Sequence, residues 1–269
     1  MMKKALVSLL IGGALAVASL PAFSQSDDKT IHLLIEGLKV YEDSAKVLGQ
    51  ELQKAGYTLE VQAFTNGVQA SLAVEKGEAD AGYHRHQASL NAFNAQYGTH
   101  LVAAFKCFTD PAGLFSKKYP SLQDLPDGAT IAVHVEPANY WRPFLILQKA
   151  GLIRLRDGVK PTDVTEKDII DNPKHLKFVA LDYALLIPAL QDVDASFLYS
   201  TQAAEIGLSY QDAIGLEDPQ YQSPDVIYVQ NGQQQSAKIQ ALEKAYHSAA
   251  VKQSLLDSYG GKPVLIPAW

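Results

Sequence analysis

The residues best suited to bind a charged solute lie in the segment Asn139-Tyr140-Trp141-Arg142-Pro143. Proline inside a helix costs about 3 kcal/mol, but the first turn tolerates it, so Pro143 predicts a helix that begins close to Asn139 or Tyr140. Free backbone N–H groups and the helix dipole favour an anion at that end. The Arg142 guanidinium can hold a carboxylate through two hydrogen bonds. The alternative is that Asn139 is a plain N-cap and Arg142 a solvated side chain.

A second candidate is the pair His84 and His86, which follows a predicted strand. Residues two apart on a strand share a face, so the two imidazoles could form half of a zinc site. Asp80, His134 and Glu136 are the candidates for further ligands. Because this histidine spacing also occurs by chance, polar contacts to an organic ligand and plain surface positions are the alternatives.

Sequence motifs of common enzyme classes are missing. The chain has no G-x-S-x-G, H-E-x-x-H or G-x-x-x-x-G-K-[ST] motif, and no G-x-G-x-x-G after a strand. The single cysteine, Cys107, lies in an apolar stretch and is expected to be a buried, inert thiol. We therefore expect no enzyme activity and no cofactor, and a hydrolase is the weakest alternative.

The first residues have the pattern of a cleaved export signal. Lys3-Lys4 precedes an apolar run from Ala5 to Leu20, and Ala22-x-Ser24 is a small-x-small cleavage site. A membrane-spanning helix would need about 20 apolar residues and different flanks. No cysteine lies near the cleavage site for lipid attachment. Residues 1–24 are therefore expected to be a signal peptide, and the mature protein to be periplasmic, soluble, not lipidated and not stably anchored in the membrane.

Charge and length limit the partners and the architecture. The 23 Lys and Arg residues and 29 Asp and Glu residues give a net charge of −6, or about −8 without the two leader lysines. Such a surface repels nucleic acid, which is not expected as a partner. The roughly 245 residues after the leader suffice for one large domain or two linked lobes without disulfides.

Strand-like and helix-like segments alternate along the chain, which predicts an α/β fold. The first series has predicted strands at 31–35, 58–64, 79–83, 100–107 and 112–116, and predicted helices at 45–55, 68–75 and 88–97. The second series has predicted strands at 129–135, 176–181 and 195–199, and predicted helices at 139–150 and 184–190. The chain then returns with a strand at 225–230 and a helix at 237–249, which predicts two lobes joined by crossing strands.

Ordered short stretches from about Leu52 to Trp269 carry a family resemblance. The most specific are Gly77-Glu78-Ala79-Asp80-Ala81, Leu90-Asn91-Ala92-Phe93-Asn94, residues 113–118, residues 121–129, Gln148-Lys149-Ala150-Gly151, Asp171-Asn172-Pro173-Lys174 and Ile266-Pro267-Ala268-Trp269. Together they resemble the NlpA-type methionine-binding lipoprotein family, the substrate-binding components of methionine ABC importers.

The resemblance implies a type II periplasmic-binding-protein fold, in which two α/β lobes close on a ligand in the cleft between them. On this basis residues 25–118 and 225–269 form lobe one, and residues 119–224 form lobe two. The partners implied are a small-molecule ligand and an ABC transporter permease, and a monomer is expected. The ligand-binding positions, with no metal ligand among them, are Arg142, Asn139, His86, His84, Tyr83, Tyr199 and Asp225.

Several of these positions depart from the family pattern. The departures are Gly67 for a pocket tyrosine, Gly82 for an asparagine before the retained Tyr83, His84 for an aromatic, Tyr199-Ser200-Thr201 for Asn-Gly-Asn, Asp225 for an asparagine, and the absence of the lipid-bearing cysteine. An apolar pocket has thus lost aromatic lining and gained imidazole and carboxylate groups. Unpaired buried polar groups should make it reject methionine. Gly67 and Gly82 are expected to leave room for a more polar or larger molecule.

The leading hypothesis is an ABC-importer substrate-binding protein for a small amino-acid-like carboxylate solute other than methionine. Arg142 and Asn139 would hold the carboxylate, His84 and His86 the distal group, and Asp225 an amine if there is one. The alternative on the same fold is binding of a transition metal or a metal chelate through the two histidines.

Overall fold

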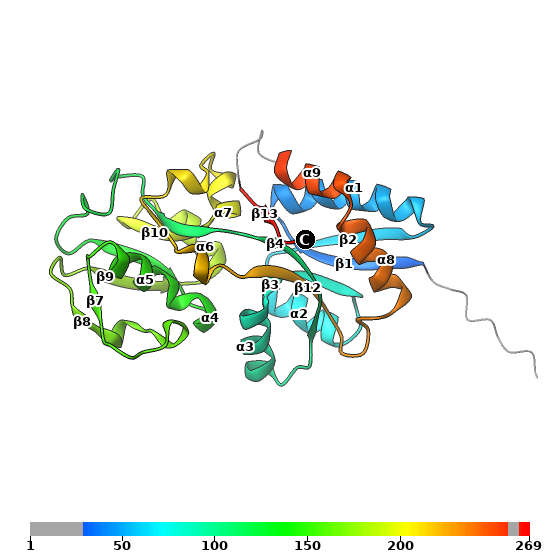
Figure 1. The fold of residues 1–269 in the computed structure, drawn as a ribbon, viewed down its shortest axis with the longest axis horizontal. Coiled ribbons are helices and arrows are strands. Elements are labelled where there is room, and N and C mark those ends of the chain that lie inside the picture. Colours follow the sequence, from blue (N-terminus) through cyan, green and yellow to red (C-terminus); the bar gives the residue numbers. More distant parts are fainter. Residues whose placement is uncertain (1–28, 258–263) are drawn as a thin grey trace, which may run out of the picture.

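The computed structural model describes residues 29–257 and 264–269, and the expected signal peptide at residues 1–24 lies outside them. Over the described residues the chain forms two lobes, each built on its own large sheet (Figure 1). The chain crosses from the first lobe to the second after β4 and returns just before β12. The predicted α/β class and two-lobe architecture are confirmed.

The first lobe holds a six-stranded sheet of order β13-β4-β12-β3-β1-β2 in the described chain. Its strands are β1 (Thr30–Glu36), β2 (Thr58–Phe64), β3 (Ala81–His86), β4 (Val102–Thr109), β12 (Pro224–Val229) and β13 (Ile266–Pro267). Its helices are α1 (Lys39–Lys54), α2 (Gly67–Glu75), α3 (Gln87–Tyr97), α8 (Ala237–Tyr246) and α9 (Ala249–Asp257). β1 pairs in parallel with β2 and β3, whereas β12 is antiparallel to β3 and β4.

The apolar patterning explains how this lobe packs. Ile31, Leu33 and Ile35 alternate along β1 and are almost completely buried. Leu48 and Leu52, four residues apart, form the buried stripe of α1 and pack in the same core. The strand and the helix stripe therefore bury one continuous apolar surface.

The second lobe holds a five-stranded sheet of order β11-β5-β10-β6-β9 over the described residues, with a small β7-β8 ladder beside it. Its strands are β5 (Ala112–Phe115), β6 (Thr130–His134), β7 (Arg154–Leu155), β8 (Ile169–Asp171), β9 (Lys177–Leu181), β10 (Ala195–Tyr199) and β11 (Gly215–Leu216). Its α-helices are α4 (Pro137–Tyr140), α5 (Arg142–Lys149), α6 (Tyr183–Ala189) and α7 (Ser200–Glu205), and its 3-10 helices are Pro161–Asp163, Glu166–Asp168, Tyr210–Asp212 and Pro219–Tyr221.

The first lobe boundary differs from the expected one at residue 118. β5 pairs with β10 and β11 of the second sheet, so residues 112–115 already belong to the second lobe. The crossing therefore lies at residues 110–111, between β4 and β5. The return of the chain into β12 at Pro224 agrees with the expected return near residue 225.

The helix predicted from Asn139 to Ala150 is divided into α4 and α5. Pro137 supplies the fixed φ of the first turn, so α4 begins before Asn139 and its N-cap is Glu136. Pro143 has no N–H to donate to the carbonyl of Asn139, and the regular helix resumes at Arg142. Asn139 is thus a buried helical residue, and the alternative that it is a plain N-cap is wrong.

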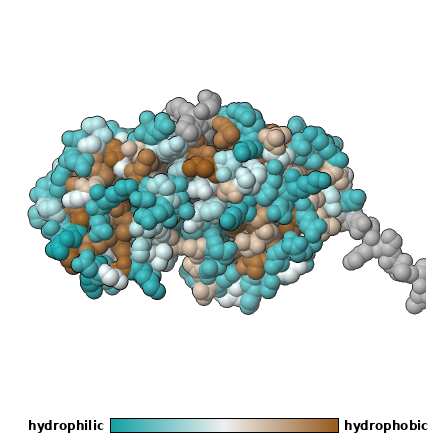
Figure 2. Space-filling model, viewed as in Figure 1, coloured by the Kyte–Doolittle hydropathy of each residue, from teal (hydrophilic) through white to brown (hydrophobic). Residues whose placement is uncertain are grey.

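The visible surface is mostly hydrophilic, and its lower edge is notched between the two lobes (Figure 2). The helices that border this notch are α3 from the first lobe and α4 from the second, which pack against each other. In the part of the chain that the structure describes, no helix combines the length and apolar character needed to cross a membrane.

Candidate functional site

Most of the predicted ligand-binding residues lie where the two lobes meet. On the first lobe, β3 and β12 run side by side, and Asp225 is paired with His86 in their register. On the second lobe, Asn139 lies in α4 and Arg142 begins α5. The carboxyl ends of the parallel strands β1 and β3 point to this junction, where open α/β sheets generally hold their ligands.

Arg142 is buried, with 5% of its surface exposed, and the solvated alternative is therefore wrong. Its Nε and Nη2 atoms donate to the two carboxylate oxygens of Glu217 at 2.8 and 2.7 Å. Its Nη1 atom donates to Oδ1 of Asn139 at 3.2 Å. The rings of Phe197 and Tyr199 lie 5.3 and 5.1 Å from the guanidinium carbon, within cation–π range.

Glu217 is a residue of this site that the sequence reasoning missed. Its side chain is 2% exposed, and Oε1 also accepts the backbone N–H of Ala112 at 2.9 Å. It follows a two-residue strand, and nothing in its local sequence distinguishes it from other acidic residues. A guanidinium has five N–H groups, and these bonds use three of them. One N–H on Nη1 and one on Nη2 of Arg142 have no partner in the described part of the chain.

Asn139 links the two lobes through its amide. Nδ2 donates to Oε2 of Glu136 at 3.0 Å, so Oδ1 is the atom that faces Arg142 and Nε2 of His86, 3.0 Å away. His86 therefore carries its proton on Nε2, while its Nδ1 accepts the backbone N–H of Ser89 at 3.3 Å. Burial, and then the charge of Arg142, lower the pKa of His86, in agreement with a neutral ring.

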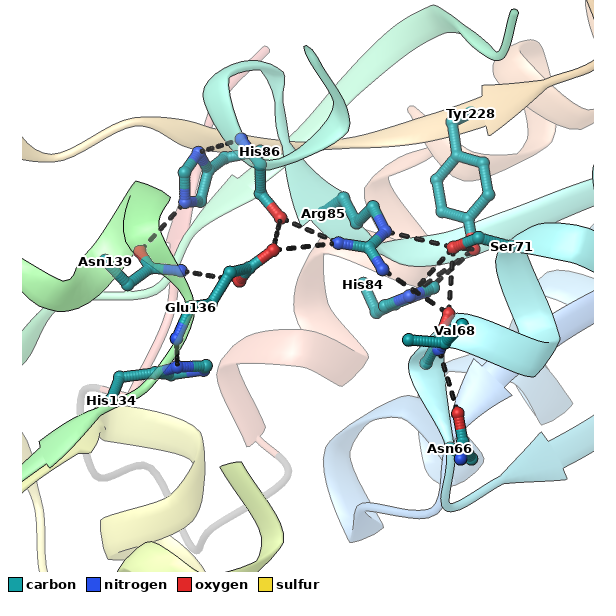
Figure 3. A network of polar contacts seen from close by, with 12 residues as sticks. Asn66, Val68, Ser71, His84, Arg85, His86, His134, Glu136, Asn139 and Tyr228 are labelled. Atoms are coloured by element: carbon teal, nitrogen blue, oxygen red, sulfur yellow. Dashed lines mark hydrogen bonds and ion pairs between the residues drawn. The ribbon is translucent and has the colours of Figure 1, made fainter. Parts of the chain in front are cut away.

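Glu136 carries this network into the first lobe (Figure 3). Its Oε1 accepts from Nη1 of Arg85 at 3.1 Å and from the hydroxyl of Ser89 at 2.7 Å. Burial opposes its ionisation, but the charges of Arg85 and His134 hold the pKa of Glu136 below its usual value. Arg85 also donates to the hydroxyl of Ser71 at 3.0 Å. The carboxylate is thus ionised and bonded on both oxygens.

His84 is enclosed by the first lobe. The Tyr228 hydroxyl lies 2.9 Å from its Nδ1, and the Phe64 ring contacts it edge-on at 4.6 Å between centroids. Burial, and then the charge of Arg85, lower the pKa of His84 well below its usual value, while a hydrogen bond with the Gly67 backbone opposes this. The imidazole is therefore neutral and already bonded within its own lobe.

The expectation that Gly67 and Gly82 leave room for a larger solute is wrong. A Cβ on Gly82 would lie 2.2 Å from the Tyr228 ring, and one on Gly67 would lie 3.0 Å from Nε2 of His84. Because protein interiors pack densely, these two rings occupy the space that the missing side chains leave. Tyr228, which the sequence reasoning did not single out, thus closes this side of the site together with His84.

Tyr83 lies on the other face of the first sheet, in contrast to its expected place at the ligand. Side chains alternate along β3, and Tyr83 points into the core beneath α1 and α8. Its ring packs against Tyr41 and Phe108, and its hydroxyl is hydrogen-bonded to that of Tyr246. The structure therefore places Tyr83 among the residues that stabilise the lobe.

Tyr199 ends β10 inside the junction between the lobes, next to Arg142. Burial raises the pKa of its hydroxyl well above the usual value, so this hydroxyl stays protonated. In the following turn, the backbone N–H and hydroxyl of Thr201 donate to Asp110 at 3.2 and 2.5 Å. Among the described residues, Ser200 has the one buried side-chain oxygen without a hydrogen-bond partner.

Carboxyl groups gather where the lobes meet. Burial, and then the charges of Asp225 and Asp110, raise the pKa of Glu36 to about 8. Burial also raises the pKa of Asp110 to about 8 and that of Asp225 to about 7, although Thr201 and Arg142 respectively oppose it. A cation placed among these groups would lower all three pKa values and ionise them.

The contacts of the two histidines do not favour a metal site. His84 bonds within its own lobe, whereas His86 bonds to Asn139 of the second lobe. Across residues 29–257 and 264–269, no group of three or more His, Cys, Asp or Glu side chains is arranged to hold a metal ion. The metal alternative therefore gains no support from this arrangement.

A pocket of about 240 Å³ lies on the second lobe, on the α5 side of the Arg142–Glu217 pair. Its lining residues are Trp141, Arg142, Leu145, Ile146, Gln148, Lys149, Glu217, Asp218, Gln220 and Tyr221. No residue of the first lobe lines it, although Arg142 and Glu217 also belong to the junction between the lobes.

Comparison with known proteins identifies the family. A family model described as NlpA lipoprotein matches residues 39–269. The chain belongs to the NlpA lipoprotein family. The D-methionine-binding lipoprotein MetQ of Salmonella typhi is 30% identical over 261 residues, which cover 94% of this chain and 95% of the relative. The resemblance inferred from the sequence is therefore confirmed.

Solved structures agree with this assignment. A nutrient-binding protein from Burkholderia cenocepacia bound to methionine is 32% identical, with a TM-score of 0.80 over 89% of this chain and 100% of that one. An ABC transporter periplasmic substrate-binding protein from Coxiella burnetii is 31% identical, with a TM-score of 0.80 over 88% of this chain and 100% of that one. The NlpA family consists of solute-binding proteins of ABC transporters and not of enzymes.

Proposed function

We propose that this chain is the periplasmic substrate-binding protein of an ABC importer for a small amino-acid-like carboxylate solute other than methionine. The observation that carries the proposal is the buried Arg142 at the junction of the lobes, with one unused N–H on each Nη atom. Together these two donors form a second fork that matches the geometry of a carboxylate. Glu217 and Asn139 hold the guanidinium in place from its other edges.

The opposite end of the solute carries cationic or hydrogen-bond donor groups. Asp225 lies on β12 beside His86, and the described chain offers its carboxylate no hydrogen bond or ion pair. The charges of Asp225 and Asp110 raise the pKa of Glu36, and the charge of Asp225 raises the pKa of Asp110. Buried carboxylates need a partner, and a positively charged solute group supplies one.

This arrangement also argues against methionine as the solute. His84 and Tyr228 already satisfy each other, so they neither reject a thioether nor bind a polar tail. The discrimination rests instead on Glu36, Asp110 and Asp225. Although Glu36 is hydrogen-bonded to Tyr183 and Asp110 to Thr201, the single ammonium of methionine cannot satisfy the acceptors that the three carboxyl groups still offer. A solute with an additional donor or cationic group pairs with more of these carboxylates, and unpaired buried polar groups discriminate strongly between ligands.

A binding screen on solute-free protein tests the proposal. The protein is stripped by unfolding, dialysis and refolding, and is then titrated by calorimetry with methionine, neutral polar amino acids and diamino acids. We expect a diamino or donor-rich amino acid to bind at least 100-fold more tightly than methionine. Tighter binding of methionine than of all polar candidates would contradict the proposal.

Export and processing follow from the sequence and stay a prediction. Cleavage after Ser24 would give a mature protein that begins at Gln25 and carries no lipid. Amino-terminal sequencing and intact mass measurement of the protein from the periplasmic fraction check this. A lipid-modified mass, or recovery in the membrane fraction alone, would contradict it.

A further inference from the structure

We infer that the Arg85–Glu136 ion pair is a latch that holds the two lobes together in the absence of a solute. Arg85 lies on β3 of the first lobe, and Glu136 is the N-cap residue of α4 in the second lobe. Their atoms Nη1 and Oε1 are 3.1 Å apart, and the side chains are 8% and 27% exposed. The pair thus spans the junction at the edge where α3 meets α4 (Figures 1 and 3).

Both charged groups of the latch have several partners without a bound molecule. Glu136 accepts from Arg85 and Ser89 of the first lobe on one oxygen, and from Asn139 of its own lobe on the other. The guanidinium of Arg85 also bonds to Ser71 and lies 4.4 Å from the centre of the Phe93 ring. No solute atom is needed to satisfy either charge.

Other ion pairs in the described chain connect residues of the same lobe and cannot hold the cleft closed. Lys238 and Asp80, for example, are 3.3 Å apart within the first lobe and are similarly shielded, at 25% and 24% exposed. Arg85 and Glu136 differ because opening the cleft must separate them. Opening replaces this charge-assisted hydrogen bond with contacts to water, so the pair favours the closed state by its net free energy.

The consequence concerns the population of the closed state. A contact that exists only in the closed state shifts the equilibrium towards closure. The size of the shift is the difference in the free energy of that contact between the closed and open states. The latch therefore populates the closed conformation before any solute binds. This holds whatever solute the protein takes, because neither Arg85 nor Glu136 is assigned to the carboxylate or amine contacts.

Small-angle X-ray scattering of stripped protein tests the latch directly. Native mass spectrometry first confirms that no small molecule remains bound. We expect the scattering curve of the stripped wild-type protein to match the closed structure. An open conformation of the stripped wild-type protein would overturn the inference.

Variants separate the ion pair from general packing. Glu136→Gln keeps the size of the side chain and one of its two acceptor oxygens, but removes the charge that faces Arg85. We expect Glu136→Gln and Arg85→Gln each to increase the radius of gyration, and the double variant to increase it no further than either alone. Lys238→Gln is the matched control and should leave it unchanged.

The folded state of each variant is checked by far-ultraviolet circular dichroism. If Arg85→Gln does not fold, the test rests on the radius of gyration of Glu136→Gln compared with that of Lys238→Gln. Scattering of folded Glu136→Gln that superimposes on the wild-type curve would overturn the latch.

Discussion

Arg142 can bind a solute carboxylate only on the edge that Glu217 leaves open. Glu217 occupies Nε and Nη2, so its bond orients the guanidinium plane towards the junction of the lobes. A planar fork held in this way loses little conformational freedom when it binds. In the proposed function Glu217 is accordingly a positioning residue, which would act on the solute through Arg142.

Removing both members of this pair should abolish binding while the fold is retained. Arg142→Ala alone would leave Glu217 buried and unpaired, at a cost of about 3–5 kcal/mol in stability. We therefore predict that the double variant Arg142→Met/Glu217→Gln unfolds within a few degrees of the wild type but binds the cognate solute at least 100-fold more weakly. Calorimetry and thermal unfolding measure the two effects. Wild-type affinity in the folded double variant would contradict the assignment.

Asp225→Asn should weaken binding in a manner that depends on pH. Because the pKa of Asp225 is about 7 in the free protein, its carboxyl is largely ionised at pH 8 and largely protonated at pH 6. We predict a loss of affinity of about tenfold or more at pH 8 and a smaller loss at pH 6. Calorimetry at the two pH values measures this, with the exposed Asp157→Asn as control. An equal loss at both values would show that the charge is not involved.

At the scale of elements, close packing between β3 and β12 shapes the site. Gly82 of β3 lets the Tyr228 ring of β12 cross directly over the backbone, where it reaches His84. The two strands are antiparallel neighbours, and a register shift between Val226 and Ile227 marks an irregularity in their pairing. The glycine therefore provides space for a neighbouring ring rather than for a ligand.

Gly82→Ala should destabilise the first lobe. Its Cβ would approach the Tyr228 ring to 2.2 Å, and we predict a loss of about 1–3 kcal/mol in the free energy of unfolding. Gly49→Ala is the matched control. Gly49 lies inside α1, and a Cβ there would meet Leu59 at 3.8 Å, which is an ordinary van der Waals contact. That control should be neutral or stabilising by up to about 1 kcal/mol. Urea denaturation of both variants measures the difference, and equal stabilities would refute the packing argument.

At the scale of the whole molecule, the carboxyl groups between the lobes make stability depend on pH. The raised pKa values of Glu36, Asp110 and Asp225 mean that the folded protein binds more protons than the unfolded chain between about pH 4 and 8. Stability therefore falls as pH rises through this window. The lowered pKa values of His86 and His134 act in the opposite sense, but only below about pH 6.5.

We predict that the free energy of unfolding of solute-free protein decreases from pH 6.5 to pH 8, where the carboxyl groups dominate. Urea denaturation at three pH values across this window measures the slope. Glu36→Gln should flatten it, since that variant removes one of the titrating groups. A constant or rising stability would contradict the electrostatic account.

Local patterns predicted the elements well but most of the site contacts poorly. The strand at Thr58–Phe64 has the predicted bounds, because periodicity and turn residues are properties of neighbouring positions. Local patterns alone did not predict that Arg142, Asn139 and His86 lie close together. That prediction came from the family resemblance. The predicted boundary at residue 118 failed, because strand order depends on pairing between distant segments.

The partners of the site residues could not be inferred from local sequence, because they are distant in the chain. Arg142 and Glu217 are 75 positions apart, and Tyr228 and His84 are 144 positions apart. Tyr83 was misplaced for a different reason, since the alternation along β3 puts its side chain on the opposite face from His84. The alternation along β3 is by itself sufficient to exclude Tyr83 from the face that carries His84.

The most direct test of the central claim is native mass spectrometry of protein purified from the periplasm without refolding. We predict one bound small molecule per chain, with a carboxylate and at least one additional donor group, and a mass that differs from that of methionine. The Arg142→Met/Glu217→Gln variant should carry none. A wild-type protein that retains methionine, or a double variant that retains the same solute, would contradict the account.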